Sequence, residues 1–462
     1  MARSANSVLE VRNGGSDTNG GGFVTGASGT DHTLQDAAQY SVTDGVTNGT
    51  TTITSATASF GTDVVGNWMY VSGGTGSVTA DWYEITVRVS ATEVTVDRST
   101  GLTAGTGVTL KIGGAFASPG RASNLMVSGN LAFIKYHATA YSITTATLGA
   151  GGPCNFTGGD SYGAFVGYDT TRTFMNTDAN RPTILATVGS ITMVGSSSGS
   201  YQTVYVRNLI ADGDNQTSVY GFSLNSYGVF NAHNCKAVDC TSNGFAQGRF
   251  TFCKAENCGS SGFDGGSYSP SVAVGCWADG CGTYGFSTSV QNIACFGCIA
   301  SNCAIGFHVG ACFNCVAYNS TGDGFDRYYY LQFDVFFINC ISYESGAYGF
   351  DIESRPASGL IFHCAGGSNT SGTVVNATDA NWQNQEFITL TADPFTNAAA
   401  GDFSLNNVAG GGALLRGLGF PGVFPGGLTT GYLDVGAVQH YEPTPAEVAE
   451  AVWEYGDRSL TA

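Results

Sequence analysis

The chain has 462 residues, of which 42% are hydrophobic and only 11% are charged, and its net charge is −18. This apolar content is enough for a packed core, so the chain does not belong with disordered proteins. The acidic balance argues against nonspecific nucleic-acid binding, which needs a basic face. No run approaches the roughly 18 apolar residues of a membrane span. With 67 glycines and few charges, the surface must be polar through small residues, which favours a β-protein.

The N-terminal part, residues 1–115, predicts a β-rich module. Its first residues lack the apolar segment of a secretory signal, so we expect synthesis in a cytoplasm. Residues 50–74 and 81–99 alternate apolar and polar side chains in short runs separated by Gly and Asp. This alternation is typical of an antiparallel sheet with one solvated face.

A repeat dominates residues 116–365. Six segments begin with Cys and reach Gly–Phe eight or nine residues later, and they start at Cys235, Cys253, Cys276, Cys298, Cys315 and Cys340. A weaker seventh start is Cys364. The period of about 22 residues is too short for helical repeats or propeller blades. Short β-capable runs between Gly, Ser and Asn instead predict the coils of a parallel β-helix.

The columns of this repeat predict which side chains face inward. Each marker Cys and the small residue two positions later share one face of a strand, and the variable residue between them faces the other way. Cys235 and Ala237 should therefore point inward and Lys236 outward. The Phe of each Gly–Phe pair should fill the core, and the preceding Gly should supply a turn with positive φ.

The cysteines allow more than one interpretation. Cys295–Cys298 and Cys312–Cys315 have the spacing of a zinc site. However, Cys298 and Cys315 belong to the repeat column, and the counterparts of Cys295 and Cys312 in other coils are core-like. We expect free buried thiols that act as small hydrophobes, with disulfides between stacked coils as an alternative. No metal and no cofactor is expected.

The residue after each Phe forms a polar column that includes His308, Asp326 and Asp351. Carboxylates on adjacent rungs lie roughly 5 Å apart, the separation found in retaining glycosidases, so these three residues are the candidate catalytic groups. The alternative is a solvated polar face. The aromatic run Tyr328, Tyr329 and Tyr330 could stack against sugar rings, or could pack beneath a long coil.

The C-terminal part changes character twice. Residues 366–441 lose the Cys marker, and we expect them to form C-terminal coils and a cap. Residues 442–462 predict a helical tail, because Thr444 and Glu447 form a capping box around Pro445. Its apolar stripe, made by Val448, Val452 and Tyr455, would attach to a partner or pack on the chain's own solenoid.

The ends of the chain carry a family resemblance. The opening VRNGGSDTNGGG and the later DPFTNAAAGDFSL and GYLDVGAVQHYE resemble right-handed parallel β-helix proteins of the pectate-lyase-like superfamily. The final AVWEYGDRSLTA resembles the tail ends of structural proteins of tailed bacteriophages. The resemblance implies a right-handed parallel β-helix solenoid in a tailspike, fibre or capsid-decorating protein, commonly a homotrimer. The calcium-binding Asp cluster and the Arg motif of pectate lyases are not recognisable.

These observations favour a non-catalytic structural component of a bacteriophage virion, assembled in the host cytoplasm. Its expected partners are other virion proteins, further copies of itself and a host surface glycan, without nucleic acid or membrane. One alternative is a polysaccharide depolymerase, either a glycoside hydrolase or a lyase, acting through His308, Asp326 and Asp351. Another is a glycan-binding adhesin that uses Tyr328, Tyr329 and Tyr330.

Overall fold

In the computed structural model, the chain forms two compact units. Unit 1 comprises Met1–Ala294 and Asn302–Ala304, and unit 2 comprises Cys295–Ser301 and Ile305–Ala462. The structure describes residues 4–101, 103–156, 161–172, 180–196, 202–224, 229–266, 271–288, 293–326, 335–352, 359–375, 382–419 and 433–439.

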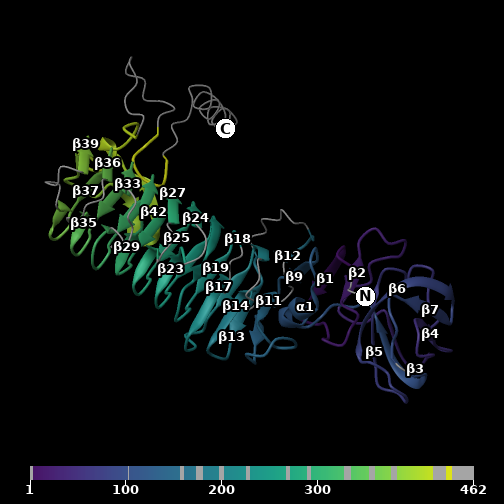
Figure 1. The fold of residues 1–462 in the computed structure, drawn as a ribbon. Coiled ribbons are helices and arrows are strands. Elements are labelled where there is room, and N and C mark those ends of the chain that lie inside the picture. The colour runs from purple at the N-terminus through teal and green to yellow at the C-terminus, as the bar shows by residue number, and fades with distance from the viewer. Residues whose placement is uncertain are drawn as a thin grey trace, which may run out of the picture. The chain divides into compact units, whose positions relative to one another are not determined.

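Most strands of unit 1 belong to three sheets, to which successive strands contribute in turn (Figure 1). Their strands pair in parallel, except that β2 pairs antiparallel with β1. The first sheet holds β2 (Gly22–Val24), β1 (Ser7–Val11), β9 (Leu131–Lys135), β12 (Ser161–Tyr168), β15 (Gln202–Arg207), β18 (Val229–His233), β21 (Gly248–Thr251) and β24 (Ser271–Val274). The second holds β10 (Tyr141–Ile143), β13 (Thr183–Ala186), β16 (Ile210–Asp212), β19 (Lys236–Val238), β22 (Lys254–Glu256) and β25 (Trp277–Asp279). The third holds β11 (Cys154–Phe156), β14 (Ile191–Ser196), β17 (Val219–Leu224), β20 (Phe245–Ala246), β23 (Ser261–Asp264) and β26 (Tyr284–Ser287). Three strands therefore make one coil, and the predicted right-handed parallel β-helix is confirmed.

The predicted N-terminal β-module contains a closed antiparallel barrel with the strand order β3-β4-β7-β6-β5-β8, whereas β1 and β2 of the same predicted range belong to the first sheet of the solenoid. Its strands are β3 (Tyr40–Thr47), β4 (Thr52–Thr54), β5 (Trp68–Ser72), β6 (Asp81–Ser90), β7 (Glu93–Val96) and β8 (Gly105–Ile112). Inward side chains such as Ile53, Val94 and Leu110 form its core. Closure pairs every strand on both sides, so the barrel leaves no open sheet edge.

The only α-helix among the described residues, α1 (Pro119–Leu125), follows the barrel and packs against β1, β9 and β11. Ser118 caps its N-terminus by accepting a hydrogen bond from the Arg121 N–H, and Pro119 occupies the first helical position. Asp17 fixes this start, because its carboxylate accepts from the Ala117 and Ser118 N–H groups and from the Ser118 hydroxyl.

Unit 2 follows the same three-sheet plan. One sheet holds β30 (Ala311–Phe313), β33 (Val335–Ile338), β36 (Gly359–Phe362) and β39 (Trp382–Gln385). The second holds β28 (Ile299–Ser301), β31 (Val316–Tyr318), β34 (Ile341–Tyr343), β37 (Ala365–Gly367) and β40 (Ile388–Thr389). The third holds β29 (Ile305–His308), β32 (Phe325–Asp326), β35 (Tyr348–Asp351) and β38 (Gly372–Val375). Strand β27 (Ile293–Phe296) begins in unit 1 and ends in unit 2.

Columns of identical side chains fill the interior of each unit, as the repeat predicts. Cys235 and Ala237 are fully buried, whereas Lys236 between them is half-buried on the outer side. The Phe rings stack almost parallel, with centroids 4.8 Å apart between Phe245 and Phe263 in unit 1 and between Phe307 and Phe325 in unit 2. Burying each ring contributes about 1.5–3 kcal/mol, and each stacked contact adds about 0.5–1.5 kcal/mol.

The predicted role of the glycine before each Phe is wrong. Gly262 lies in β23 and Gly324 directly precedes β32, and neither is among the residues with positive φ. Instead, a Cβ at Gly262 would lie 2.8 Å from both the Ala278 Cβ and the Gly285 carbonyl oxygen. The glycine is needed because the next coil leaves no room for a side chain.

Positive φ occurs instead just before the cysteines, often at asparagine. Asn234, Asn314 and Asn339 have φ between 51° and 56°, a region that Asn tolerates better than most residues. Their side chains also link coils: the Asn339 amide donates to the Asn314 side-chain oxygen at 3.2 Å. These asparagines therefore turn the chain in their own coils and join neighbouring coils, whereas Phe252, Gly275 and Gly297 take the turn position in other coils.

The C-terminal segment of unit 2 covers the outer side of the second sheet. It contains β41 (Phe395–Asn397), η1 (Ala398–Ala400), β42 (Asp402–Leu405) and η2 (Gly412–Leu414). Phe395 and Phe403 pack edge-on against Tyr318. The Gly436 N–H donates to the Asn339 carbonyl at 2.8 Å, and Gly436 lies against Ile341. The outward side chain of Ile341 is therefore fully buried, unlike that of Lys236.

Candidate functional site

The structure brings the predicted catalytic candidates His308, Asp326 and Asp351 into one column of unit 2. Their strands β29, β32 and β35 pair in register, which aligns His308 with Asp326 and Asp326 with Asp351. The His308 Nδ1 and the Asp326 Oδ2 lie 2.7 Å apart. The two side chains are 13% and 24% exposed, so the expected open polar face is in fact half-buried.

This geometry supplies a histidine–aspartate pair. An aspartate that holds one ring nitrogen orients the imidazole, which is an arrangement used in general acid–base catalysis. A retaining glycosidase instead needs two carboxylates facing the same glycosidic bond. Because His308 engages the Asp326 carboxylate, the column has groups suited to proton transfer but does not present Asp326 and Asp351 as two equivalent carboxylates.

Unit 1 has a carboxylate at the equivalent position, Asp264 in β23. Its oxygens accept hydrogen bonds from the Gly266 N–H at 3.0 Å, the Asn243 amide at 3.0 Å and the Ser287 hydroxyl at 3.4 Å. Burial raises the pKa of Asp264, and these hydrogen bonds only partly offset the rise. In unit 1 the carboxylate at this position of the polar column therefore stabilises a turn, which is a structural role.

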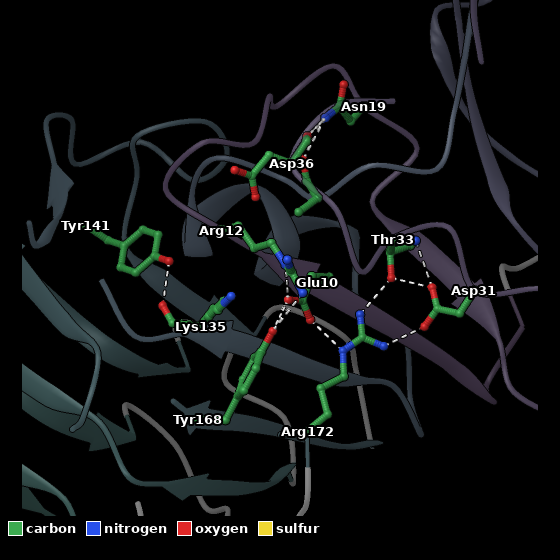
Figure 2. A network of polar contacts seen from close by, with 11 residues as sticks. Glu10, Arg12, Asn19, Asp31, Thr33, Asp36, Lys135, Tyr141, Tyr168 and Arg172 are labelled. Carbon is green, nitrogen blue, oxygen red and sulfur yellow. Dashed lines mark hydrogen bonds and ion pairs between the residues drawn. The ribbon is translucent and has the colours of Figure 1, made fainter. Parts of the chain in front are cut away.

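A second polar cluster, which sequence reasoning missed, surrounds Glu10 in β1 (Figure 2). The Glu10 side chain is fully buried and accepts hydrogen bonds from Arg12 Nε at 2.7 Å, from Arg172 Nε at 2.5 Å and from the Tyr168 hydroxyl. Arg172 also contacts the Asp31 carboxylate at 2.6 Å. A charged residue between Leu9 and Val11 in the strand Ser7–Val11 was the available signal, because such a group is rarely buried without partners.

Electrostatic interactions in this cluster keep Arg172 charged and the Tyr168 hydroxyl protonated. Burial by itself would lower the pKa of Arg172, but the negative charges of Glu10 and Asp31 outweigh it, so the pKa is raised. Burial and the charge of Glu10 both raise the pKa of Tyr168, which keeps its hydroxyl a donor. Both Glu10 oxygens are occupied, so the carboxylate ties β1, the segment before the barrel and the end of β12 together.

The four cysteines with zinc-like spacing lie in the interior of unit 2. Cys295, Cys298, Cys312 and Cys315 are free and fully buried. The thiols of Cys298 and Cys315 donate to backbone carbonyls: Cys298 Sγ is 3.5 Å from the Phe296 oxygen, and Cys315 Sγ is 3.5 Å from the Cys295 oxygen. Burial raises the pKa of Cys312, which favours the protonated thiol. Within the described ranges, no three His, Cys, Asp or Glu side chains are grouped to hold a metal ion.

The remaining candidates lie outside the described residues. These are Tyr328, Tyr329 and Tyr330, predicted to bind glycan, and Val448, Val452 and Tyr455, predicted for attachment, together with the predicted C-terminal helix. Their roles stay predictions. None of the helices in the described part of the chain is long and apolar enough to cross a membrane.

Together the fold and these clusters define a three-sheet parallel β-helix with an N-terminal antiparallel barrel. No family model and no curated protein matches the sequence. Among solved structures, "Geobacillus virus E2 - ORF18" is 14% identical over 56% of this chain and 53% of its own, with a TM-score of 0.37. The chain thus spans about half the length of that protein.

Two carbohydrate-active structures are similar at the same level. The A-module of the Azotobacter vinelandii mannuronan C-5 epimerase AlgE4 is 14% identical, with coverages of 60% and 77% and a TM-score of 0.36. The catalytic domain of a GH87 α-1,3-glucanase is 10% identical, with coverages of 80% and 92% and a TM-score of 0.31.

Proposed function

We propose that the protein is a non-catalytic structural component of a bacteriophage virion, a tailspike, fibre or capsid-decorating protein. The observation that carries the proposal is the regular packing inside each unit, where Cys, Ala and Phe columns stack coil on coil. Each coil pairs its backbone with the next, so local opening breaks contacts on both sides. Such a solenoid is suited to a stiff, protease-resistant shaft or knob.

Three further features support this role. The buried Glu10 cluster fixes the first coils to the segment that leads into the barrel. The chain has few charged residues, and most of them are acidic. This composition suits a soluble particle surface rather than a nucleic-acid interface. The chain ends resemble those of phage structural proteins. The partners we propose are other virion proteins, two further copies of this chain and a host surface glycan.

The direct test is the protein composition of purified particles. Particles from the phage that encodes this chain should contain it in fixed stoichiometry after density-gradient purification, as measured by quantitative mass spectrometry. Antibody labelling in electron microscopy should place it at one structural position. The matched control is a non-structural protein from the same lysate, which should be lost during purification. Intact infectious particles that lack the chain would exclude the proposed role.

One observation favours a second candidate, a polysaccharide depolymerase, namely the His308–Asp326 pair. If this pair transfers protons, His308→Ala or Asp326→Asn should slow host-glycan cleavage by about 10²–10⁴-fold. The control is Asp264→Asn, because Asp264 occupies the equivalent position in unit 1 without a histidine partner. Cleavage at the wild-type rate in folded His308 and Asp326 variants would reject this candidate.

A further inference from the structure

An apolar stripe runs along the outer side of the first sheet of unit 2. In β30, β33 and β36 the side chains of Cys312, Phe337 and Ile361 are fully buried, so their neighbours along each strand point outward. The outward residues, which we call the aromatic stripe, are Phe296 at the end of β27 and Phe313, Phe336, Ile338, Leu360 and Phe362. Phe296 and Phe336 are 40% and 39% exposed, which is high for such large apolar side chains.

Two neighbouring rings of the stripe stack on one another. The rings of Phe296 and Phe313 are stacked with centroids 5.1 Å apart and an angle of 6° between their planes. Each ring therefore covers a face of its neighbour. The covered faces are not available for stacking on a sugar ring, whereas the exposed apolar surface suits contact with another protein surface.

The net charge of the chain also indicates which partner the aromatic stripe contacts. The chain carries a net charge of −18, so copies of it repel one another overall. The six outward positions of β30, β33 and β36 hold only apolar side chains, including Ala311. In contrast, outward positions of the same sheet in unit 1 include Arg207, His233 and Arg249. The stripe is thus a face through which two acidic copies can approach without bringing like charges together.

We infer that the aromatic stripe is the surface through which copies of this chain associate with one another. Interfaces between subunits are enriched in Phe and depleted of charge at their centre, as the stripe is. Two solenoids with the same rung spacing of about 4.8 Å can align side by side, so that each rung meets its equivalent in the other copy. This inference rests on the homo-oligomer part of the proposed function, and it assigns the contact face.

The test compares the mass in solution of the full-length protein with that of two variants, by light scattering and sedimentation velocity. Wild type should form a closed oligomer. Phe336→Asp should weaken association at least about tenfold, because a buried unpaired charge costs more than 1.4 kcal/mol. The control is Phe252→Asp in unit 1, where Phe252 is more exposed, at 62%, but lies outside the stripe. This control should associate like wild type.

If Phe336→Asp does not fold, two other variants test the same face. Phe296→Ser changes the more exposed end of the stripe, and Phe336→Cys should form a disulfide between copies under mild oxidation, whereas Phe252→Cys should not. A monomeric wild type overturns both the homo-oligomer and this face. An oligomer that is unchanged in folded Phe336→Asp and Phe296→Ser overturns only the face. The third outcome is a monomeric wild type in which Val452→Asp increases hydrogen exchange in the strands of the stripe. This result would identify the chain's own C-terminus as the segment that covers the stripe.

Discussion

Replacing Glu10 by Gln tests whether the buried cluster stabilises the first coils of unit 1. Gln matches Glu in size but carries no charge, so Arg12 and Arg172, whose side chains are only 15% and 13% exposed, lose their shared carboxylate. Breaking a buried ion pair by removing one partner costs about 3–5 kcal/mol. Because Arg172 keeps its contact with Asp31, we expect the lower end, about 3 kcal/mol.

The assay is thermal unfolding of the full-length protein by differential scanning calorimetry. At about 2–4 °C per kcal/mol, the transition of unit 1 should fall by about 6–12 °C. The control is Glu256→Gln, because Glu256 also contacts two cations, Lys236 and Lys254, but on the outer side of the second sheet. Partly exposed pairs contribute about 0–1 kcal/mol, so its transition should hardly move. Equal effects of the two substitutions would refute the reasoning.

Three further substitutions test the packing and the polar column. Phe263→Ala removes a ring stacked on both of its neighbours and should cost about 3–5 kcal/mol in denaturant unfolding, whereas Phe252→Ala should change stability by less than about 0.5 kcal/mol. Gly262→Ala should cost about 1–3 kcal/mol in the same assay, and a neutral result would contradict the close-packing role of this glycine. The folded-state pKa of Asp264 is raised, so its contribution to stability is complete at low pH and is lost as pH rises through that pKa. Unfolding measured from about pH 3 to 7 should therefore show wild type losing stability relative to Asp264→Asn, and parallel curves would contradict the raised pKa.

The sequence by itself determined the fold class and the interior of the solenoid. Cys235 and Ala237 recur once per coil beside a Phe, and side chains on a strand alternate between two faces, so the columns predict what points inward. A period of about 22 residues with tolerated insertions then leaves the stacked coils of a β-helix as the consistent arrangement. His308 and Asp326 fell in one column for the same reason, because register along a solenoid follows directly from the repeat.

The tertiary structure decided whatever depends on contacts outside that period. The role of Gly262 follows from how closely the next coil approaches, which no single coil encodes. Glu10 and Arg172 are 162 residues apart, and no local pattern links them before the chain closes its first coils. Similarly, Ile341 faces outward as its column predicts, yet the C-terminal segment buries it. Periodic contacts can be inferred from spacing in the sequence, whereas contacts between non-equivalent segments exist only once the whole chain is folded.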